Sequence, residues 1–255
     1  MQQYFAKNKN LELLDDDIYH IRKVMRMKKG DLIKVVYDNV IYTCKLLDLK
    51  DNITFDIINS ETKSNKSYSI TVAFSLIKEQ RLDYLLQKCT EIGVDSFIPL
   101  NTKNSVVKID VNKVASKLSR WSKILKEASE QSNRHNIPKI NEILELKKLA
   151  KEDFDLKLLC SLNKNTKSIK KVLQNNPNCA RILLVTGPEG GFDLEEEKFL
   201  MENGFISITL GDNVLRAETA PLAAASMINY ELMRWVVWKT YLQRYPIHLI
   251  IFIII

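Results

Sequence analysis

Residues 181–193 have the sequence RILLVTGPEGGFD. The first half is a short apolar run bounded by a turn, which is typical of a strand buried on both faces of a sheet. The second half is rich in glycine, which permits positive φ and lets backbone groups approach a ligand closely. Asp193 and Glu196 have the spacing of a capping box, so we expect a helix to begin here. Because ligands of open α/β sheets bind beyond the carboxyl ends of the strands, this turn is a candidate binding loop.

The same arrangement recurs downstream. Residues 206–210 predict a second strand, and residues 211–220 (GDNVLRAETA) lead into a helix with Pro221 in its first turn. We therefore expect two neighbouring strands that both end in glycine-bearing loops. Neither loop has the Lys-Ser/Thr pair of a Walker loop or the GxGxxG spacing, so phosphate loops of these kinds are excluded. A plain structural turn remains the alternative for each loop taken alone.

The flanking sequence predicts an α/β domain. Further strands are expected at residues 70–75, 96–100 and 154–160, with an amphipathic segment at 167–173. Leu82, Leu85, Leu86, Cys89 and Ile92 follow helical spacing up to Gly93, and residues 114–131 carry a second apolar stripe. Strands that alternate with helices favour a mostly parallel sheet.

The first 70 or so residues predict a small, barrel-like β module. Residues 32–36, 40–48 and 52–58 are β-branched or aromatic runs separated by turn signals, and residues 60–69 have the composition of a linker. We expect a β domain at residues 1–69, an α/β domain at 70–233 and an atypical tail at 234–255. The apolar run 248–255 is far shorter than a membrane helix, so we expect no membrane anchor.

Composition and charge favour a nucleic-acid partner. The 255 residues carry a net charge of +7, and 45% of them are hydrophobic, as in an ordinary globular protein. Basic residues gather in two windows, 20–34 and 101–140, although solvated faces are an equally good interpretation. The four cysteines form no CxxC and no zinc spacing, and residues 1–9 are polar. We expect reduced thiols, no metal and a cytoplasmic location.

Five segments together resemble the RsmE family of SPOUT methyltransferases. They are residues 20–31 (HIRKVMRMKKGD), 78–94 (KEQRLDYLLQKCTEIGV), 120–138 (RWSKILKEASEQSNRHNIP), 186–193 (TGPEGGFD) and 210–220 (LGDNVLRAETA). Each is weak alone, but five in the family's order are specific, and the resemblance extends to about residue 233. Asn213 stands where a basic residue is expected, and Ala217 where Thr is usual.

The resemblance implies a fold, a reaction and an assembly. The expected fold is a SPOUT-type, mostly parallel α/β sheet with a C-terminal trefoil knot, preceded by a PUA-like RNA-binding β-barrel. The expected reaction is S-adenosylmethionine-dependent methylation of N3 of a uridine in small-subunit (16S) ribosomal RNA. The expected assembly is a homodimer.

The resemblance also assigns the two loops to the cofactor. Backbone groups there would hold its adenine and methionine portions, with turn glycines of purely structural role as the alternative. The candidate cofactor-binding residues are Thr186, Gly187, Gly190, Gly191, Leu210, Gly211, Val214, Leu215 and Thr219.

Arg216 and Glu218 are the candidate catalytic residues. Uridine N3 carries a proton that must leave before or during attack on the methyl group. A cation such as Arg216 would stabilise the developing uracil anion, and Glu218 would accept the proton. The alternative is a structural Arg216–Glu218 pair that holds the loop. No histidine is an obvious base: His135 is the nearest candidate by motif, and His20 lies in the expected RNA-binding module.

Arg22, Arg26, Arg120 and Arg134 are the candidate RNA-binding residues. Arg22 and Arg26 are four residues apart, so they would share one face if that segment were helical. Such phosphate contacts position RNA without reading its sequence. A solvated helix face is nearly as good an interpretation for Arg120.

Two other functions stay open at this stage. One is a SPOUT enzyme that acts on another RNA, such as the ribose 2′-OH of transfer RNA. The other is a non-catalytic RNA-binding factor in ribosome assembly. The glycine loops and Arg216 disfavour the second, and the order of the N-terminal module and the LRAETA loop disfavour the first.

Overall fold

The computed structural model describes residues 1–50, 53–64, 66–163 and 166–244, and side chains up to residue 233. The chain divides into two compact units. Unit 1 comprises Met1–Lys66 and Ser119–Pro138, and unit 2 comprises Ser67–Leu118 and the chain from Lys139 onward. These units differ from the expected domains 1–69 and 70–233 mainly at residues 119–138. This segment was expected in the α/β domain, but it belongs to the N-terminal unit.

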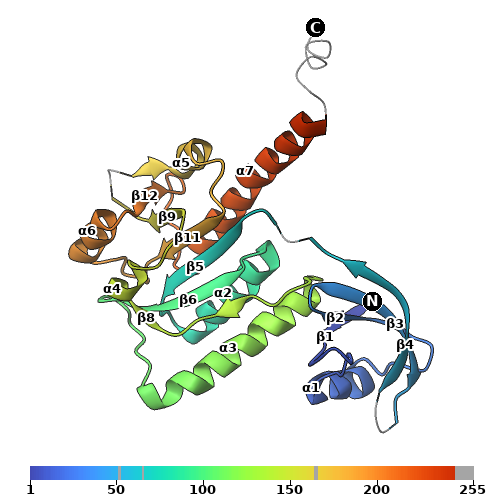
Figure 1. Cartoon of the computed structure of the whole chain (residues 1–255). Helices are drawn as coiled ribbons and strands as arrows, with labels where there is room; N and C mark the ends of the chain where they lie inside the picture. Colours follow the sequence, from blue (N-terminus) through green and yellow to red (C-terminus); the bar gives the residue numbers. More distant parts are fainter. Residues whose placement is uncertain (51–52, 65, 164–165, 245–255) are drawn as a thin grey trace. The chain divides into compact units, whose positions relative to one another are not determined.

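Unit 2 is built on one parallel sheet (Figure 1). The strand order is β10-β12-β9-β11-β5-β6-β7, and the short β8 also pairs with β6. The strands are β5 (Ser69–Ser75), β6 (Ser96–Asn101), β7 (Lys139–Ile140), β8 (Leu144–Glu145), β9 (Leu156–Cys160), β10 (Lys167–Ser168), β11 (Arg181–Thr186) and β12 (Ile206–Thr209). All of their pairings are parallel, which confirms the expected fold class.

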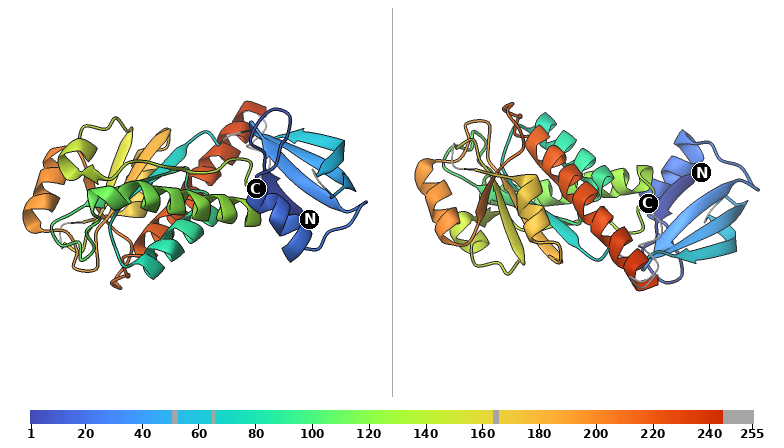
Figure 2. Two further views of the ribbon diagram at one scale, coloured as in Figure 1. Left: turned by 90° about the horizontal axis from the view of Figure 1, so that it is seen from below. Right: turned by 90° about the horizontal axis from the view of Figure 1, so that it is seen from above.

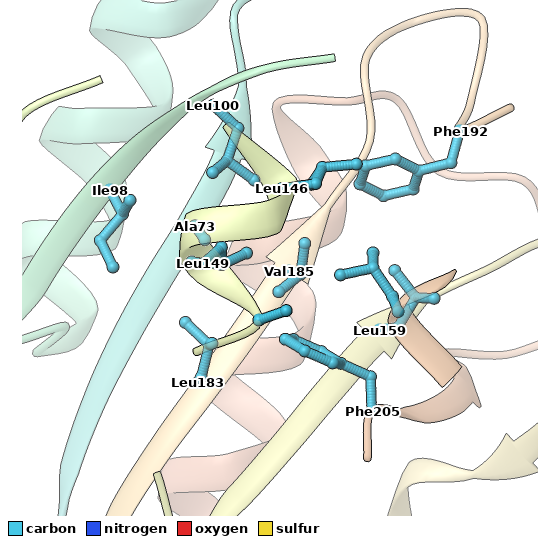
Figure 3. Close-up of a cluster of buried hydrophobic side chains, with 12 residues drawn as sticks. Ala73, Ile98, Leu100, Leu146, Leu149, Leu159, Leu183, Val185, Phe192 and Phe205 are labelled. Carbon is cyan, nitrogen blue, oxygen red and sulfur yellow. The ribbon is translucent and has the colours of Figure 1, made fainter. Parts of the chain in front are cut away.

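Helices cover both faces of this sheet. On one face α7 (Thr219–Arg244) contacts β5 and β11 and packs against α2 (Glu79–Ile92) and α5 (Ile169–Asn175), as Figure 2 shows. The other face is covered by α4 (Leu146–Leu149) and α6 (Leu194–Glu202), whose leucines share a buried cluster with strand residues (Figure 3).

The composition of β11 explains this double cover. Successive side chains of a strand point to opposite faces. Leu183 and Val185 enter the cluster beneath α4 and α6 (Figure 3), whereas Ile182 and Leu184 lie on the opposite face, and all four are fully buried. A strand buried on both faces must be apolar throughout, which is what residues 181–186 predict.

The helices of unit 2 begin and end where local signals place them. Gly93 adopts φ 100° and caps the C-terminus of α2, since a left-handed residue satisfies the last carbonyls at low cost. Asp193 and Glu196 form the expected capping box at the start of α6. The atypical tail expected from residue 234 begins too early, because α7 continues to Arg244. The apolar run 248–255 lies outside the described residues.

Unit 1 contains a four-stranded mixed sheet in the order β1-β2-β3-β4. Its elements are β1 (Gln2–Phe5), α1 (Asp15–Tyr19), the π-helix η1 (His20–Val24), β2 (Leu32–Tyr37), β3 (Val40–Asp48) and β4 (Thr54–Thr62). The three strands expected here are confirmed. The predicted start of the linker at residue 60 is wrong, because Ser60, Glu61 and Thr62 belong to β4 and pair with β3.

Residues 119–131 of the long helix α3 (Val111–Gln131) begin the second segment of unit 1. Within unit 1, Lys126 forms an ion pair with the buried Asp17 at 2.6 Å, and Glu130 accepts the Phe5 N–H at 3.3 Å. The side chain of Gln3 donates to the Arg134 carbonyl at 2.6 Å. These polar contacts join the end of α3 to β1 and α1, which explains why the segment belongs to this unit.

All four cysteines are free thiols. Within the described residues, no helix has the length and apolar character needed to cross a membrane.

The core packing gives a first prediction. Leu183→Ala should lower the free energy of unfolding by about 2–5 kcal/mol, because it leaves a cavity in a fully buried cluster. Val106→Ala, at a position that is 69% exposed, should change it by less than about 0.5 kcal/mol. Chemical denaturation measures both values, and equal values for the two variants would contradict this description of the core.

Candidate functional site

Three loops meet at one edge of the unit 2 sheet. Strand β9 lies between β12 and β11 and is parallel to both, so the carboxyl ends of the three strands are adjacent. The prediction that β11 and β12 are neighbours is therefore wrong, since β9 separates them. The loop that follows β9, described from Ser161 to Asn163, therefore lies beside the two glycine-bearing loops. The sequence pattern did not indicate that this third loop belongs to the site.

The three loops enclose a pocket of about 600 Å³, a size typical of small-molecule sites. The predicted residues that line it are Thr186, Gly187, Gly190, Gly191, Leu210, Gly211, Val214, Leu215 and Arg216. Glu218 and Thr219 are not among its lining residues. Thr219 instead begins α7 and donates its N–H to the Arg216 carbonyl at 2.9 Å.

The loop after β11 is held by packing and by the loop after β6. Gly187 faces the ring of Phe192, and a Cβ there would lie 3.1 Å from a ring carbon. Gly191 adopts φ 71°, and its carbonyl accepts from the Asn104 side chain at 3.2 Å. Lys103 pairs with Asp193 at 2.9 Å and lowers the pKa of that carboxyl group. Gly187 and Gly191 therefore have structural roles in addition to any contact with a ligand.

The loop after β12 leaves the Arg216 side chain exposed at the pocket. The carbonyl of Arg216 accepts the N–H groups of Thr219 and Ala220, both at 2.9 Å, which closes the first turn of α7. Among the described residues the Arg216 guanidinium has no ion-pair partner. The alternative interpretation, an Arg216–Glu218 pair that holds the loop, is therefore not observed in this part of the chain.

Arg81 connects two of the loops. Its guanidinium lies 3.0 Å from Glu189, in the loop after β11, and its Nε lies 3.9 Å from Glu218, in the loop before α7. Glu218 is buried, and its second oxygen has no hydrogen-bond partner among the described residues. Arg81 lies in a quoted family segment, but its role became visible only when the fold brought these loops together.

The third loop donates hydrogen bonds to a buried carboxylate. Glu197 of α6 lines the pocket and accepts hydrogen bonds from the Ser161 hydroxyl, at 3.0 Å, and from the Asn163 amide. Burial raises the pKa of Glu197 in spite of these two donors. Cys160 also lines the pocket, and burial raises the pKa of its thiol to about 12, so it is a poor nucleophile at neutral pH.

One side chain in the pocket wall has an unused hydrogen-bonding group. Thr186 is 1% exposed, and its hydroxyl has no partner within the described residues. Its backbone carbonyl, by contrast, accepts from Ser75 at 3.3 Å. A buried polar atom without a partner is costly, so a ligand or water with a matching group is expected there.

The four candidate RNA-binding arginines all belong to unit 1. Arg22, Arg120 and Arg134 are partly exposed, and Arg26 is exposed. The expectation that Arg22 and Arg26 share a helix face is wrong, because η1 ends at Val24 and Arg26 adopts φ 50°. The Arg134 guanidinium donates to Asn136 at 2.9 Å.

Family models match both parts of the chain. Residues 64–229 match a model described as an RNA methyltransferase domain, and residues 13–58 match an RNA methyltransferase PUA domain. The ribosomal RNA small subunit methyltransferase E of Bacillus subtilis is 33% identical over 92% of this chain and 99% of its own length. Its counterpart from Synechocystis is 32% identical over 83% of this chain and 70% of its own length.

Solved structures agree with these matches. A ribosomal RNA small subunit methyltransferase E from Neisseria gonorrhoeae, bound to S-adenosyl methionine, has a TM-score of 0.80 and 28% identity. It aligns over 90% of this chain and 97% of its own. A Legionella pneumophila methyltransferase in complex with the same cofactor has a TM-score of 0.82, with 28% identity and the same coverage of both chains.

The bridge made by Arg81 gives the second prediction. Arg81→Met should increase amide hydrogen exchange in residues 187–192 and 212–218, because it removes the partner of both Glu189 and Glu218. Lys88→Met is the matched control, since among the described residues Lys88 pairs only with Glu91 of the same helix. Unchanged exchange in both loops of Arg81→Met would show that the bridge does not order them.

Proposed function

The chain belongs to the ribosomal RNA small subunit methyltransferase E family, and we infer that it transfers the methyl group of S-adenosylmethionine to 16S ribosomal RNA. The observation that carries this inference is the pocket at the ends of β9, β11 and β12, which unites both family loops. Our finer proposal is that the acceptor is N3 of a uridine, as the resemblance in the LRAETA loop implies.

The pocket fits the proposed cofactor. Its volume of about 600 Å³ is sufficient for a nucleoside with an amino-acid arm, and backbone groups of two glycine-bearing loops line it. The Thr186 hydroxyl, which has no partner among the residues that the structure describes, would supply one hydrogen bond. When bound, the cofactor would supply an electrophilic methyl group on a sulfonium centre. The proposed cofactor-binding residues are Thr186, Gly187, Gly190, Gly191, Leu210, Gly211, Val214 and Leu215, with Thr219 supporting the loop.

Arg216 and Glu218 suit the acceptor side of the reaction. Methyl transfer is an in-line displacement, so the protein mainly positions the acceptor and stabilises its charge. The exposed Arg216 guanidinium, which has no ion-pair partner in the described part of the chain, would stabilise the uracil anion as N3 loses its proton. Glu218, which does not line the pocket, would take that proton through water, at the oxygen that has no partner among the described residues.

Unit 1 would position the RNA. It contains the match to the RNA methyltransferase PUA domain and the four arginines Arg22, Arg26, Arg120 and Arg134. Guanidinium groups bind phosphates through paired hydrogen bonds and so fix register and orientation. The resemblance further supports a homodimer, a trefoil knot around the pocket and a cytoplasmic location as parts of the proposal.

The direct test of this function is transfer of labelled methyl groups to small ribosomal subunits from a strain that lacks the activity. Digestion and mass spectrometry should then identify N3-methyluridine in 16S RNA. Label in ribose would contradict the proposed acceptor and favour a 2′-O enzyme. Cofactor binding without any transfer would favour the non-catalytic assembly factor.

The catalytic assignment gives the third prediction. Arg216→Ala should lower the single-turnover rate by about 10²- to 10³-fold, and Glu218→Gln by about 10²-fold or more. Cofactor affinity should change little, because both groups act on the acceptor. Lys198→Ala, on the exposed face of α6, should keep the wild-type rate. Full activity in both site variants would refute the assignment.

The proposed RNA-binding arginines give the fourth prediction. Each of Arg22→Ala, Arg26→Ala, Arg120→Ala and Arg134→Ala should weaken binding to small subunits. The slope of log affinity against log salt should also become shallower by about 0.7–0.9 for each phosphate that the variant no longer neutralises. Lys148→Ala, on α4 of unit 2, should leave this slope unchanged. A salt slope that none of the four variants alters would place the RNA-binding surface elsewhere.

A further inference from the structure

Glu197 is a buried carboxylate in the wall of the pocket. It is 8% exposed and lies in the first turn of α6, facing the loop after β9. Its two oxygens accept from Ser161 and Asn163, which are both neutral. Within the described part of the chain, no lysine, arginine or histidine forms an ion pair with it.

The other charged groups around the pocket either lie beside a group of opposite charge or are exposed to solvent. Glu189 and Glu218 both lie beside the guanidinium of Arg81. Arg216 is exposed to solvent, which screens its charge. Among the described carboxylates that line the pocket, Glu197 is therefore the one without a cation beside it.

Burial of a carboxylate without a cation beside it is energetically unfavourable. A carboxylate removed from water loses its hydration, and two neutral donors replace only part of it. The raised pKa of Glu197 reports the same imbalance, since the cost of burial outweighs the two hydrogen bonds. A cation that entered the pocket would offset this cost.

We propose that Glu197 is a specificity-determining residue, whose negative charge selects the cationic methyl donor over its neutral product. This inference rests on the proposed function, because it takes S-adenosylmethionine as the ligand. When the S–CH₃ bond breaks, its electron pair stays on sulfur, and the acceptor nitrogen forms the new N–CH₃ bond. The sulfonium thereby becomes a neutral thioether, S-adenosylhomocysteine.

The charge change gives Glu197 a role in turnover. Before transfer, the carboxylate and the sulfonium attract each other across a pocket that excludes part of the solvent. After transfer that attraction is lost, and Glu197 is again a buried anion without a cation beside it. Product then binds less tightly than substrate, so fresh donor displaces it more readily.

Isothermal titration of the full chain with S-adenosylmethionine and with S-adenosylhomocysteine tests this proposal. Glu197→Gln should weaken binding of the donor by roughly tenfold and that of the product by less than about twofold, as expected for loss of one part-buried charge interaction. Glu197→Asp keeps the charge and should preserve most of the wild-type preference. Should Glu197→Gln fail to fold, Glu197→Ser provides a second neutral variant.

Two controls separate charge from structure. Glu195→Gln removes one charge from the same helix at an exposed position and should leave both affinities unchanged. Ser161→Ala loosens the loop without changing charge, so it should weaken donor and product to the same extent. If Glu197→Gln also weakened both ligands equally, Glu197 would only hold the loop, and the proposal would be overturned. A wild-type chain that bound neither ligand would instead refute the proposed cofactor.

Discussion

The site depends on one constraint, which is the parallel pairing of β12, β9 and β11 side by side. Carboxyl ends of adjacent parallel strands lie at the same edge of a sheet, so three loops that are far apart in sequence must converge there. Thr186, Ser161 and Leu210 each lie where one of these strands ends or just beyond it. If β9 paired elsewhere, the pocket would lose one of its walls together with the partners of Glu197.

Charge distribution around the pocket follows from this convergence. Arg81 reaches two of the loops and lies beside a carboxylate in each, which leaves Arg216 without a described ion pair. Exposed ion pairs contribute little to stability, so the main effect of such a bridge is geometric. It leaves the cationic side chain of Arg216 at the pocket while the neighbouring Glu218 stays buried.

Local signals predicted much of the fold and of the site. The apolar run 181–186, the Asp193–Glu196 capping box and the helix end at Gly93 depend on neighbours in sequence, and the structure confirms all three. The position of β9 and the partners of Arg81 and Glu197 depend on strand order, which no local pattern encodes. Residues 119–138 were assigned to the α/β domain for the same reason. Their ion pair with Asp17 and their hydrogen bond with Phe5 join residues far apart in the sequence.

Our central proposal is that the three strand ends form the methyl-donor site. A crystal structure of the chain with S-adenosylmethionine tests it most directly. We expect cofactor density between residues 161–163, 186–191 and 210–216, with the Thr186 hydroxyl engaged. Density at any other place, or a bound cofactor that does not touch the loop after β9, would contradict this conclusion.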